Sequence, residues 1–375
     1  MKLLKVKAKG FKNCVDDFEI DFVAKSKKTS EDIEYELNEI AEGLYVYNTV
    51  GVVGKNASGK TTTLELLDWC YDILGTFSLS ERGNCYDGIS LEMIFYEEGY
   101  IYRYITDLKN SDSLQDKAAF KNQKLYGKKY YKSKVRKIFE DDWDNLTIFR
   151  SEIPEEISMV FAVLKKSKFR AFYYSDSLDS EMIYSMTFKL MKLANLDQNI
   201  LIKVLKIFDE NVGNIRQIDE NNYSLEYQGQ TSKLSVQELY RFLSSGTTKG
   251  LILYIVAIIS LKMGFDLIVD EIENHFHKTL VDNLIMLYKD KKVNRNNATL
   301  YFSTHYCELL DLFNRSDNIF ITHSREKIEI ENMYETYGLR TELLKSKKFY
   351  QNAFDTAVNY EALMDLKREL LKSNA

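Results

Sequence analysis

The part of this sequence that most restricts its fold is the stretch Gly54 to Thr61, which reads GKNASGKT and follows the pattern Gly-x-x-x-x-Gly-Lys-Thr. The apolar run from Leu44 to Val53 precedes it and predicts a β-strand. The residues after it keep helical spacing in their apolar positions, which are Leu64, Leu67, Tyr71 and Leu74. A strand, a glycine-rich turn and a helix in this order turn backbone N–H groups towards one phosphate group. The sequence therefore predicts an α/β fold built around a phosphate-binding loop.

The residues of this loop have distinct expected roles. Its glycines allow the tight wrapping that points successive N–H groups at phosphate oxygens. Lys60 would supply a cation to the β- and γ-phosphates, and Thr61 a hydroxyl ligand to Mg²⁺. The alternative, a glycine-lysine loop that arises by chance, is disfavoured by the flanking strand and helix. We expect ATP and Mg²⁺ as cofactors, with the nucleotide held by Gly54, Asn56, Ala57, Ser58, Gly59, Lys60, Thr61 and Thr62.

A pair of carboxylates follows a second apolar strand, Leu267 to Val269. Asp270 would hold the metal through water, so that Asp270 and Thr61 form the metal site. Glu271, one residue further, is placed to accept a proton from the water that attacks the γ-phosphate. A solvated strand end is the alternative interpretation, and the phosphate loop in the same chain favours the catalytic one.

Two further segments suit a phosphate. The run Leu243 to Thr247 precedes an apolar helix, so Ser244, Ser245 and Gly246 would lie at a positive helix end, although a serine before a helix is also a common cap. His305 ends a strand, Thr299 to Phe302 with Ser303 and Thr304, where its imidazole could donate a hydrogen bond to the γ-phosphate. A lone histidine there is otherwise structural, and the order of the four motifs favours the functional interpretation.

That order resembles the head of ABC-type ATPases, with Leu243 to Thr247 in the place of the signature loop and His305 in that of the switch histidine. The form Gly-x-Asn-x-Ser-Gly-Lys-Thr, the early Gly10 to Asn13 and the run Asp270 to His275 resemble the SMC, RecF and OLD-like branch. Within that branch the chain looks most like the stand-alone ATPases of bacterial anti-phage systems such as PARIS, AbiL and Septu-like pairs. The resemblance covers residues 1–110 and 240–335.

The resemblance implies an α/β ABC ATPase head, which is a P-loop NTPase with a mixed sheet, an amino-terminal β-hairpin and an inserted helical lobe. It implies Lys60, Glu271 and His305 as catalytic residues, and a head-to-tail dimer in which Ser244 and Gly246 of one subunit complete the site of the other. Ser245 and Thr247 stand where transporters have glycine and glutamine. No glutamine loop is found, because Gln115 and Gln123 lie in polar sequence without an expected strand.

Hydrophobic patterning divides the chain into four parts. The alternating runs Leu4 to Ala8 and Phe18 to Phe22 predict the hairpin, and a polar loop is expected from Lys25 to Asn38. We expect an ATPase lobe with the phosphate loop at 1–115, a helical insertion with connecting strands at 116–240, a second ATPase lobe at 241–335 and a helical segment at 336–375. In the last segment, the apolar positions between Thr341 and Lys372 predict either a docking helix for a partner or a helix packed on its own core.

The overall charge says little about partners, because 51 basic and 56 acidic residues give a net charge of −5. A local basic stretch, interleaved with tyrosines, is formed by Lys117, Lys121, Lys124, Lys128, Lys129, Lys132, Lys134, Arg136 and Lys137. Such a stretch can hold nucleic-acid phosphates and stack bases, which makes DNA a candidate partner. The alternative is a solvated helical face whose charges only maintain solubility.

The four cysteines show no Cys-x-x-Cys spacing, and the charged start of the chain has no apolar signal core. Both features predict a cytoplasmic protein. The longest apolar run, Leu251 to Leu261, is shorter than the roughly 18 residues that cross a bilayer, so no membrane partner is expected. OLD proteins carry a nuclease after the ATPase, and residues 336–375 are too few for one, so any nuclease is expected on a separate polypeptide.

These observations lead to one functional expectation with one alternative. We expect an ATPase that dimerises on ATP, as a homodimer or higher homo-oligomer, and hydrolyses it to sense or gate a separate effector, a nuclease, in anti-phage defence. The alternative is a DNA-maintenance ATPase of RecF or SMC type that binds DNA through the basic stretch. An energy-coupling subunit for a transporter is disfavoured by the size of the insertion and by the signature sequence.

Overall fold

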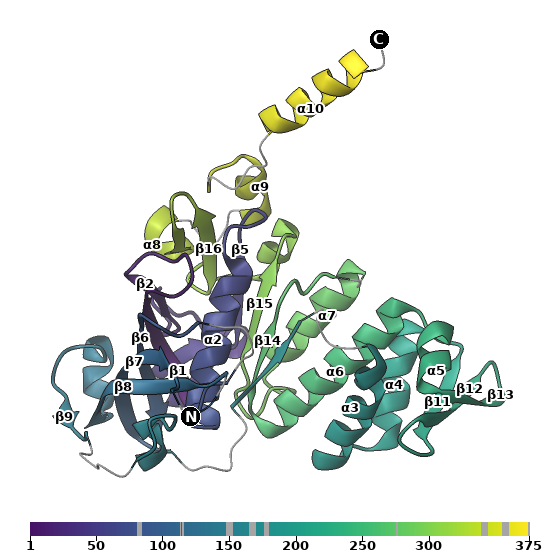
Figure 1. The fold of residues 1–375 in the computed structure, drawn as a ribbon, viewed down its shortest axis with the longest axis horizontal. Coiled ribbons are helices and arrows are strands. Elements are labelled where there is room, and N and C mark those ends of the chain that lie inside the picture. Colours follow the sequence, from purple (N-terminus) through teal and green to yellow (C-terminus); the bar gives the residue numbers. More distant parts are fainter. Residues whose placement is uncertain are drawn as a thin grey trace.

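Two six-stranded sheets form the body of the molecule (Figure 1). The computed structural model describes residues 1–80, 85–112, 114, 116–147, 153–164, 170–175, 180–274, 277–338, 344–354 and 360–373. The first sheet is antiparallel, and its strands in spatial order are β2 (Phe18–Asp21), β1 (Lys2–Lys9), β6 (Ile89–Glu97), β7 (Tyr100–Asn110), β8 (Ala118–Lys129) and β9 (Asp144–Asn145). Strands β1 and β2 confirm the predicted amino-terminal hairpin.

The second sheet is mixed and carries the phosphate loop. Its strands in spatial order are β10 (Ala171–Tyr174), β14 (Asp266–Val269), β15 (Leu300–Thr304), β5 (Thr49–Val53), β16 (Ile319–Ser324) and β17 (Ile328–Asn332). All neighbours are parallel except β16 and β17, which are antiparallel. Because β5 lies between β15 and β16 and is buried along its length, the loop that follows it opens at the middle of the sheet's carboxyl edge. The predicted α/β class, a P-loop NTPase head with a mixed sheet, is confirmed.

Helix α2 (Lys60–Gly75) lies between the two sheets (Figure 1). Its apolar side chains share one core with Phe11 and Met93 of the first sheet's side and with Ile268 and Tyr301 of the second sheet. Trp69 of α2 meets the Phe11 ring edge-on, with 5.0 Å between the ring centroids. The helix that begins at the phosphate loop is therefore held from both sides.

A second core covers the other face of the mixed sheet. It contains α6 (Ser245–Met263), α7 (Lys278–Lys289) and the 3-10 helix η3 (Cys307–Leu312). Among the described residues, only α6 is long and apolar enough to cross a membrane by length and composition, which the sequence analysis did not expect. However, 72% of its most apolar window is buried inside the molecule. Its apolar residues thus form part of the core.

The inserted lobe packs against α6. It consists of α3 (Ser180–Leu193), α4 (Gln198–Phe208), α5 (Val236–Phe242) and a three-stranded sheet of β11 (Val212–Gln217), β12 (Asn222–Tyr227) and β13 (Gln230–Ser235). The predicted helical character is wrong for the start of this region, because 118–129 form strand β8 of the first sheet. A register shift against β7 interrupts the alternation of β8, so that Lys121, Lys124 and Lys128 are three and four residues apart and resemble one face of a helix in sequence.

Two small predictions before the phosphate loop are also corrected. The expected loop at 25–38 contains helix α1 (Ser30–Tyr35), which Thr29 and Asp32 stabilise with a capping box. The expected single strand at 44–53 is divided into β4 (Leu44–Tyr47) and β5 by Asn48, and β4 pairs with β3 (Leu37–Ala41). Asn48 is fully buried, and its amide donates to the Tyr35 carbonyl at 2.8 Å, which fixes the change of direction.

The residues after β17 belong in part to the core. Helix α8 (Met333–Tyr337) follows β17, and α9 (Lys345–Tyr350) packs on η3, where Lys345 Nζ donates to the Phe313 carbonyl at 2.6 Å. Phe354 is buried against Tyr337, with 4.9 Å between the ring centroids. Helix α10 (Tyr360–Ser373) extends away from the body and exposes Leu366, Leu370 and Leu371 (Figure 1). Residues 344–354 therefore pack on the protein's own core, and the role of α10 as a docking helix remains a prediction.

We expect two truncations to separate these roles. Ending the chain after Phe354 removes exposed α10 and should leave the free energy of unfolding nearly unchanged. Ending it after Gly338 also removes Phe354 and α9, and should lower the free energy of unfolding by at least about 2 kcal/mol, the value of burying one large apolar side chain. Urea denaturation of both proteins and the full chain measures this. Equal stability of the two truncated proteins would contradict the assignment of 344–354 to the core.

Candidate nucleotide-binding site

The loop between β5 and α2 is shaped by its two glycines. A Cβ atom on Gly54 would collide with the Ser58 hydroxyl and with backbone and side chain of Thr322. Gly59 has φ of +105°, and a Cβ there would collide with the side chain of Ile328. Gly59 is also the N-cap of α2 and supplies no side chain to satisfy the first N–H groups of the helix. The loop thus leaves the amino end of α2 available to an anion.

Lys60 is 5% exposed and reaches back over the loop. Its Nζ donates to the carbonyl oxygens of Gly54 and Lys55, both at 3.1 Å, and lies 3.2 Å from His305 Nδ1. Burial lowers the pKa of the Lys60 ammonium, and the negative charge of Glu271, foremost among the carboxylates, opposes that shift. Within the described residues, no carboxylate pairs directly with this ammonium, so its charge is available to a phosphate group.

Thr61 and Asp270 lie together, as predicted for a metal site. Thr61 Oγ1 donates to Asp270 Oδ2 at 2.7 Å, and Ser303 Oγ donates to Asp270 Oδ1 at 2.5 Å. A hydroxyl and a carboxylate in contact are the oxygen donors that Mg²⁺ uses beside nucleotide phosphates. The residues therefore fit a magnesium ion held by Thr61 directly and by Asp270.

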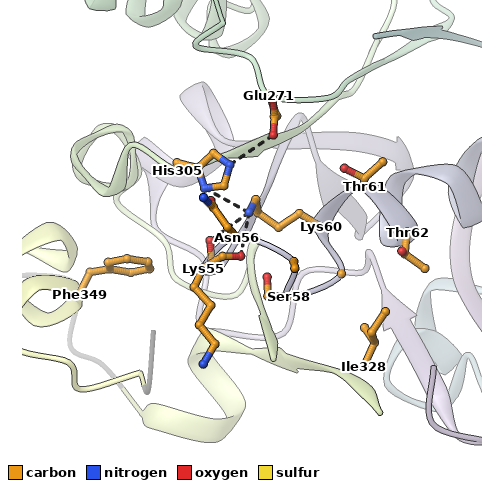
Figure 2. A pocket seen from close by; sticks show the side chains of 13 residues that line it. Lys55, Asn56, Ser58, Lys60, Thr61, Thr62, Glu271, His305, Ile328 and Phe349 are labelled. Carbon is orange, nitrogen blue, oxygen red and sulfur yellow. Dashed lines mark hydrogen bonds and ion pairs between the residues drawn. The ribbon is translucent and has the colours of Figure 1, made fainter. Parts of the chain in front are cut away.

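Glu271 and His305 form a line with Lys60 across the cavity (Figure 2). His305 Nε2 lies 3.3 Å from Glu271 Oε1, so a proton on Nε2 leaves Nδ1 free to accept from Lys60. Glu271 has φ of 49°, a left-handed backbone conformation that is uncommon and costly for a glutamate. This turn aims its carboxylate back towards the phosphate loop.

Four residues of the site were missed by sequence reasoning. Ser303 also accepts from the Glu271 N–H at 2.7 Å, so one hydroxyl positions both carboxylate residues. Glu273 is 6% exposed and accepts from the His305 N–H at 2.5 Å. Ile328 of β17 and Phe349 of α9 line the cavity. Ser303 stands beside His305 in sequence and could have been found, whereas Ile328 and Phe349 come from distant segments without a motif.

The cavity has a volume of about 1060 Å³, which is large enough for a nucleoside triphosphate. Its lining residues are Gly54 to Thr62, Glu271, His305, Ile328 and Phe349. The cradle of unsatisfied N–H groups, the unpaired ammonium of Lys60 and the Thr61–Asp270 pair together match the charges of ATP with Mg²⁺. The predicted phosphate-loop residues, the acidic pair and the histidine are thus brought to one place.

Ser244, Ser245 and Gly246 are not among the residues that line this cavity. Ser244 is the N-cap of α6, and its hydroxyl accepts from the Thr247 N–H at 3.0 Å. Gln123, expected to lack a strand, lies in β8 and accepts from the Tyr104 hydroxyl at 2.6 Å and the Met159 N–H at 2.6 Å, so it is held away from the site. Gln115 and His275 lie outside the described residues.

A mixed α/β sheet with this loop, an acidic strand end and a facing histidine defines a P-loop ATPase. A family model described as "AAA domain, putative AbiEii toxin, Type IV TA system" matches residues 50–311, which is more than half of the chain, and the chain belongs to this family. No curated protein matches the sequence.

Two solved structures match most of this chain at low sequence identity. One is the SMC head domain from Thermotoga maritima, with 13% identity, a TM-score of 0.42, and coverage of 88% of this chain and 99% of that chain. The other is the SmcHead bound to the C-winged helix domain of ScpA, with 12% identity, a TM-score of 0.47, and coverage of 90% and 100%.

Removal of the Ser303 hydroxyl is expected to slow ATP hydrolysis more than it lowers stability. Ser303→Ala removes one of the two hydroxyl donors to Asp270 and the acceptor of the Glu271 N–H, which should lower kcat by about tenfold or more because the acidic pair is held less firmly in position. Ser260→Ala is the matched control, since it removes another fully buried serine hydroxyl that donates to Phe265 and accepts from Tyr288. Steady-state phosphate release and urea denaturation of both variants distinguish the two effects. Equal rates of phosphate release in both variants would show that Ser303 has no specific role in the site.

Proposed function

We propose that this protein binds ATP with Mg²⁺ in the cavity around the Gly54 to Thr61 loop and hydrolyses it to ADP and phosphate. The observation that supports this most directly is the line of Lys60, His305 and Glu271, with contacts of 3.2 and 3.3 Å, which faces the Thr61–Asp270 pair across the phosphate loop. These groups place positive charge, a proton acceptor and metal ligands around one point, which is what phosphoryl transfer to water requires.

Each residue has a defined part in this reaction. Lys60 and the N–H groups at the start of α2 hold the β- and γ-phosphates and offset the charge that develops on them. Glu271 accepts a proton from the water as its oxygen attacks the γ-phosphorus, and ADP leaves with the electrons of the broken P–O bond. His305 holds the Glu271 carboxylate in place and can donate to a γ-phosphate oxygen. The bound magnesium ion supplies charge neutralisation of the phosphates.

We expect Lys60 and Glu271 to act at different steps. Lys60→Ala should lose nucleotide affinity, because the buried cation of the loop is removed. Glu271→Gln keeps the shape of the site and should retain ATP while turnover falls by about 10²-fold or more, as expected for a positioned base. Nucleotide binding by calorimetry and single-turnover hydrolysis separate the two. Near-normal turnover by Glu271→Gln would exclude it as the base.

We also propose that two copies of the chain share their sites head to tail, with Ser244 to Gly246 of one copy completing the cavity of the other. Two features support the proposal. The cavity is open, and among the described residues the start of α6 supplies nothing to the cavity of its own chain. Ser245 and Gly246 lie in the first turn of a 19-residue helix, where N–H groups favour a phosphate.

Mixed dimers test the shared site. A Lys60→Ala chain and a Ser244→Arg chain should each be inactive alone, yet their heterodimer contains one intact site, so about half of the activity per dimer should return. The control mixes the wild-type chain with a chain that carries both substitutions, because that heterodimer contains no intact site. Tagged chains purified as heterodimers make the comparison direct. If the first mixture recovers no more activity than the control heterodimer, the sites are not shared.

The biological role that we propose is the gating of a separate effector, a nuclease, in anti-phage defence in the cytoplasm. The family description, which names a putative toxin, supports a role in such a system. Exposed helix α10 offers a docking surface for the effector, so the chain that ends after Phe354 should lose copurification with the effector while it retains ATPase activity.

The alternative role in DNA maintenance receives less support, because about half of the cations of the basic stretch are engaged in ion pairs within the described residues. Five of its nine cations are in ion pairs, which are Lys121–Glu155, Lys128–Asp142, Lys132–Glu42, Lys134–Asp142 and Lys137–Glu140.

A further inference from the structure

A second pocket, of about 560 Å³, lies between three segments of the amino-terminal half. The segments are the end of β2 with the following loop, the turn between β3 and β4, and the 3-10 helix η1 (Lys132–Lys137) with the two residues Ile138 and Phe139. This pocket is far from the phosphate loop along β5. Arg315 and Asp317, which lie behind the pocket, precede β16 and are therefore at the amino edge of the mixed sheet. The phosphate loop lies at the carboxyl edge. The two edges are roughly 16 Å apart, which is the length of the five-residue strand β5.

The loop that forms one wall is held rigidly from behind. Arg315 is 1% exposed and donates to the Ser26 hydroxyl at 2.6 Å and to the Lys27 carbonyl at 3.4 Å. Asp317 accepts from the N–H groups of Lys25 and Ser26 at 2.9 and 2.8 Å. Arg315 and Asp317 are themselves paired, so a buried ion pair fixes the backbone from which Lys27 and Lys28 project.

The opposite walls are bonded to one another as well. Tyr130, just before η1, donates its hydroxyl to the Glu42 carbonyl at 2.8 Å, and Lys132 pairs with the Glu42 carboxylate at 2.7 Å. Ile138 is buried in a small apolar core with Leu4 and Leu44, against which Val135 and Phe139 also pack. The pocket is therefore a preformed concavity, with an aromatic wall from Tyr45 and Phe139.

Three cations of this pocket are without acidic partners. Lys27, Lys28 and Arg136 line it, and within the described residues none of them is in an ion pair. Lys25 is different, because it pairs with Asp21 and Glu335. Lys28 Nζ lies 5.5 Å from the centre of the Tyr45 ring, and partial burial together with the nearby charges of Arg315 and Arg136 lowers its pKa. Like charges held this close in a concavity favour a multiply charged anion.

We propose that this pocket binds a compact ligand with two or more phosphate groups, held by Lys27, Lys28 and Arg136, with Tyr45 and Phe139 against its organic part. An extended polynucleotide fits less well. Five cations of the basic stretch beside the pocket are in ion pairs with four carboxylates, which interrupt the positive charge that a polynucleotide would follow across the described surface. The volume of the pocket suits a small ligand.

Calorimetric titration with inorganic tripolyphosphate tests the proposal on the full chain. The Lys60→Ala background is used without Mg²⁺, so that the phosphate loop contributes little. We expect one equivalent to bind, and the further substitutions Lys27→Glu, Lys28→Glu and Arg136→Glu to weaken binding by at least about 100-fold, since three charge-assisted contacts are lost. The matched control reverses three exposed lysines of the inserted lobe, Lys203→Glu, Lys206→Glu and Lys233→Glu, and should change the affinity by less than about threefold.

Three results would overturn the proposal. One is the absence of tripolyphosphate binding to the Lys60→Ala protein, and another is an equal loss in the pocket variant and its control, which would show an effect of net charge alone. The third is pocket-dependent binding of a single-stranded oligonucleotide of about 20 nucleotides without binding of tripolyphosphate, which would assign the pocket to nucleic acid. If circular dichroism shows that the triple variant is misfolded, Arg136→Gln alone replaces it, with an expected loss of about tenfold, and unchanged affinity would then refute the proposal.

Discussion

The burial of α2 between two sheets is the constraint on which the rest of this structure depends. Buried side chains lie on both of the faces that α2 turns towards the sheets, whereas Glu65, Asp68 and Asp72 follow a partly exposed stripe. The buried apolar residues are Leu64, Leu66, Leu67, Trp69, Cys70, Tyr71, Ile73 and Leu74. A helix with this pattern cannot leave either of these faces in water without losing roughly 1.5 to 3 kcal/mol for each large apolar side chain exposed. Both sheets must therefore pack on it, and its amino end, which carries Lys60 and Thr61, is fixed relative to β5, β14 and β15.

The electrostatics of the site follow from this arrangement. Lys60 is buried with only carbonyl and imidazole partners, and Asp270 is satisfied by hydroxyl groups, so charges of opposite sign are held apart although they are close. Burying an ammonium without a carboxylate costs free energy unless an anion arrives. An anion at the loop and a cation at Asp270 would therefore both be stabilised in the folded protein, and ATP with magnesium would supply both charges together.

The segment after β17 connects the site to a surface outside it. Phe349 of α9 lines the nucleotide cavity, while α9 packs on η3, which directly follows His305 and Tyr306. Further along the same segment, α10 leaves the body of the protein. Phe349 thus joins the nucleotide cavity to the part of this segment that packs on η3.

The sequence by itself was sufficient to predict the parts of the site that follow directly after an apolar strand. The glycine-rich loop, the acidic pair after β14 and His305 after β15 each follow an apolar strand, and parallel strands bring their carboxyl ends to one edge, so their meeting could be predicted. Strand β8 was mistaken for part of a helical region, because Lys121, Lys124 and Lys128 keep the three- and four-residue spacing of a helix face, and the register shift against β7 that produces this spacing is seen only in the structure. Periodicity records which side of an element is apolar, and it does not record what covers that side.

Only the tertiary structure decided the parts that come from distant segments. The hydroxyl of Ser303 acts on Asp270 because β14 and β15 are neighbours, and Ile328 and Phe349 reach the cavity from strands and helices that carry no motif. The second pocket depends in the same way on Arg315, which lies far along the chain from the loop that it holds. Such contacts arise from packing between elements, whose energies depend on three-dimensional neighbours and leave no fixed spacing in the sequence.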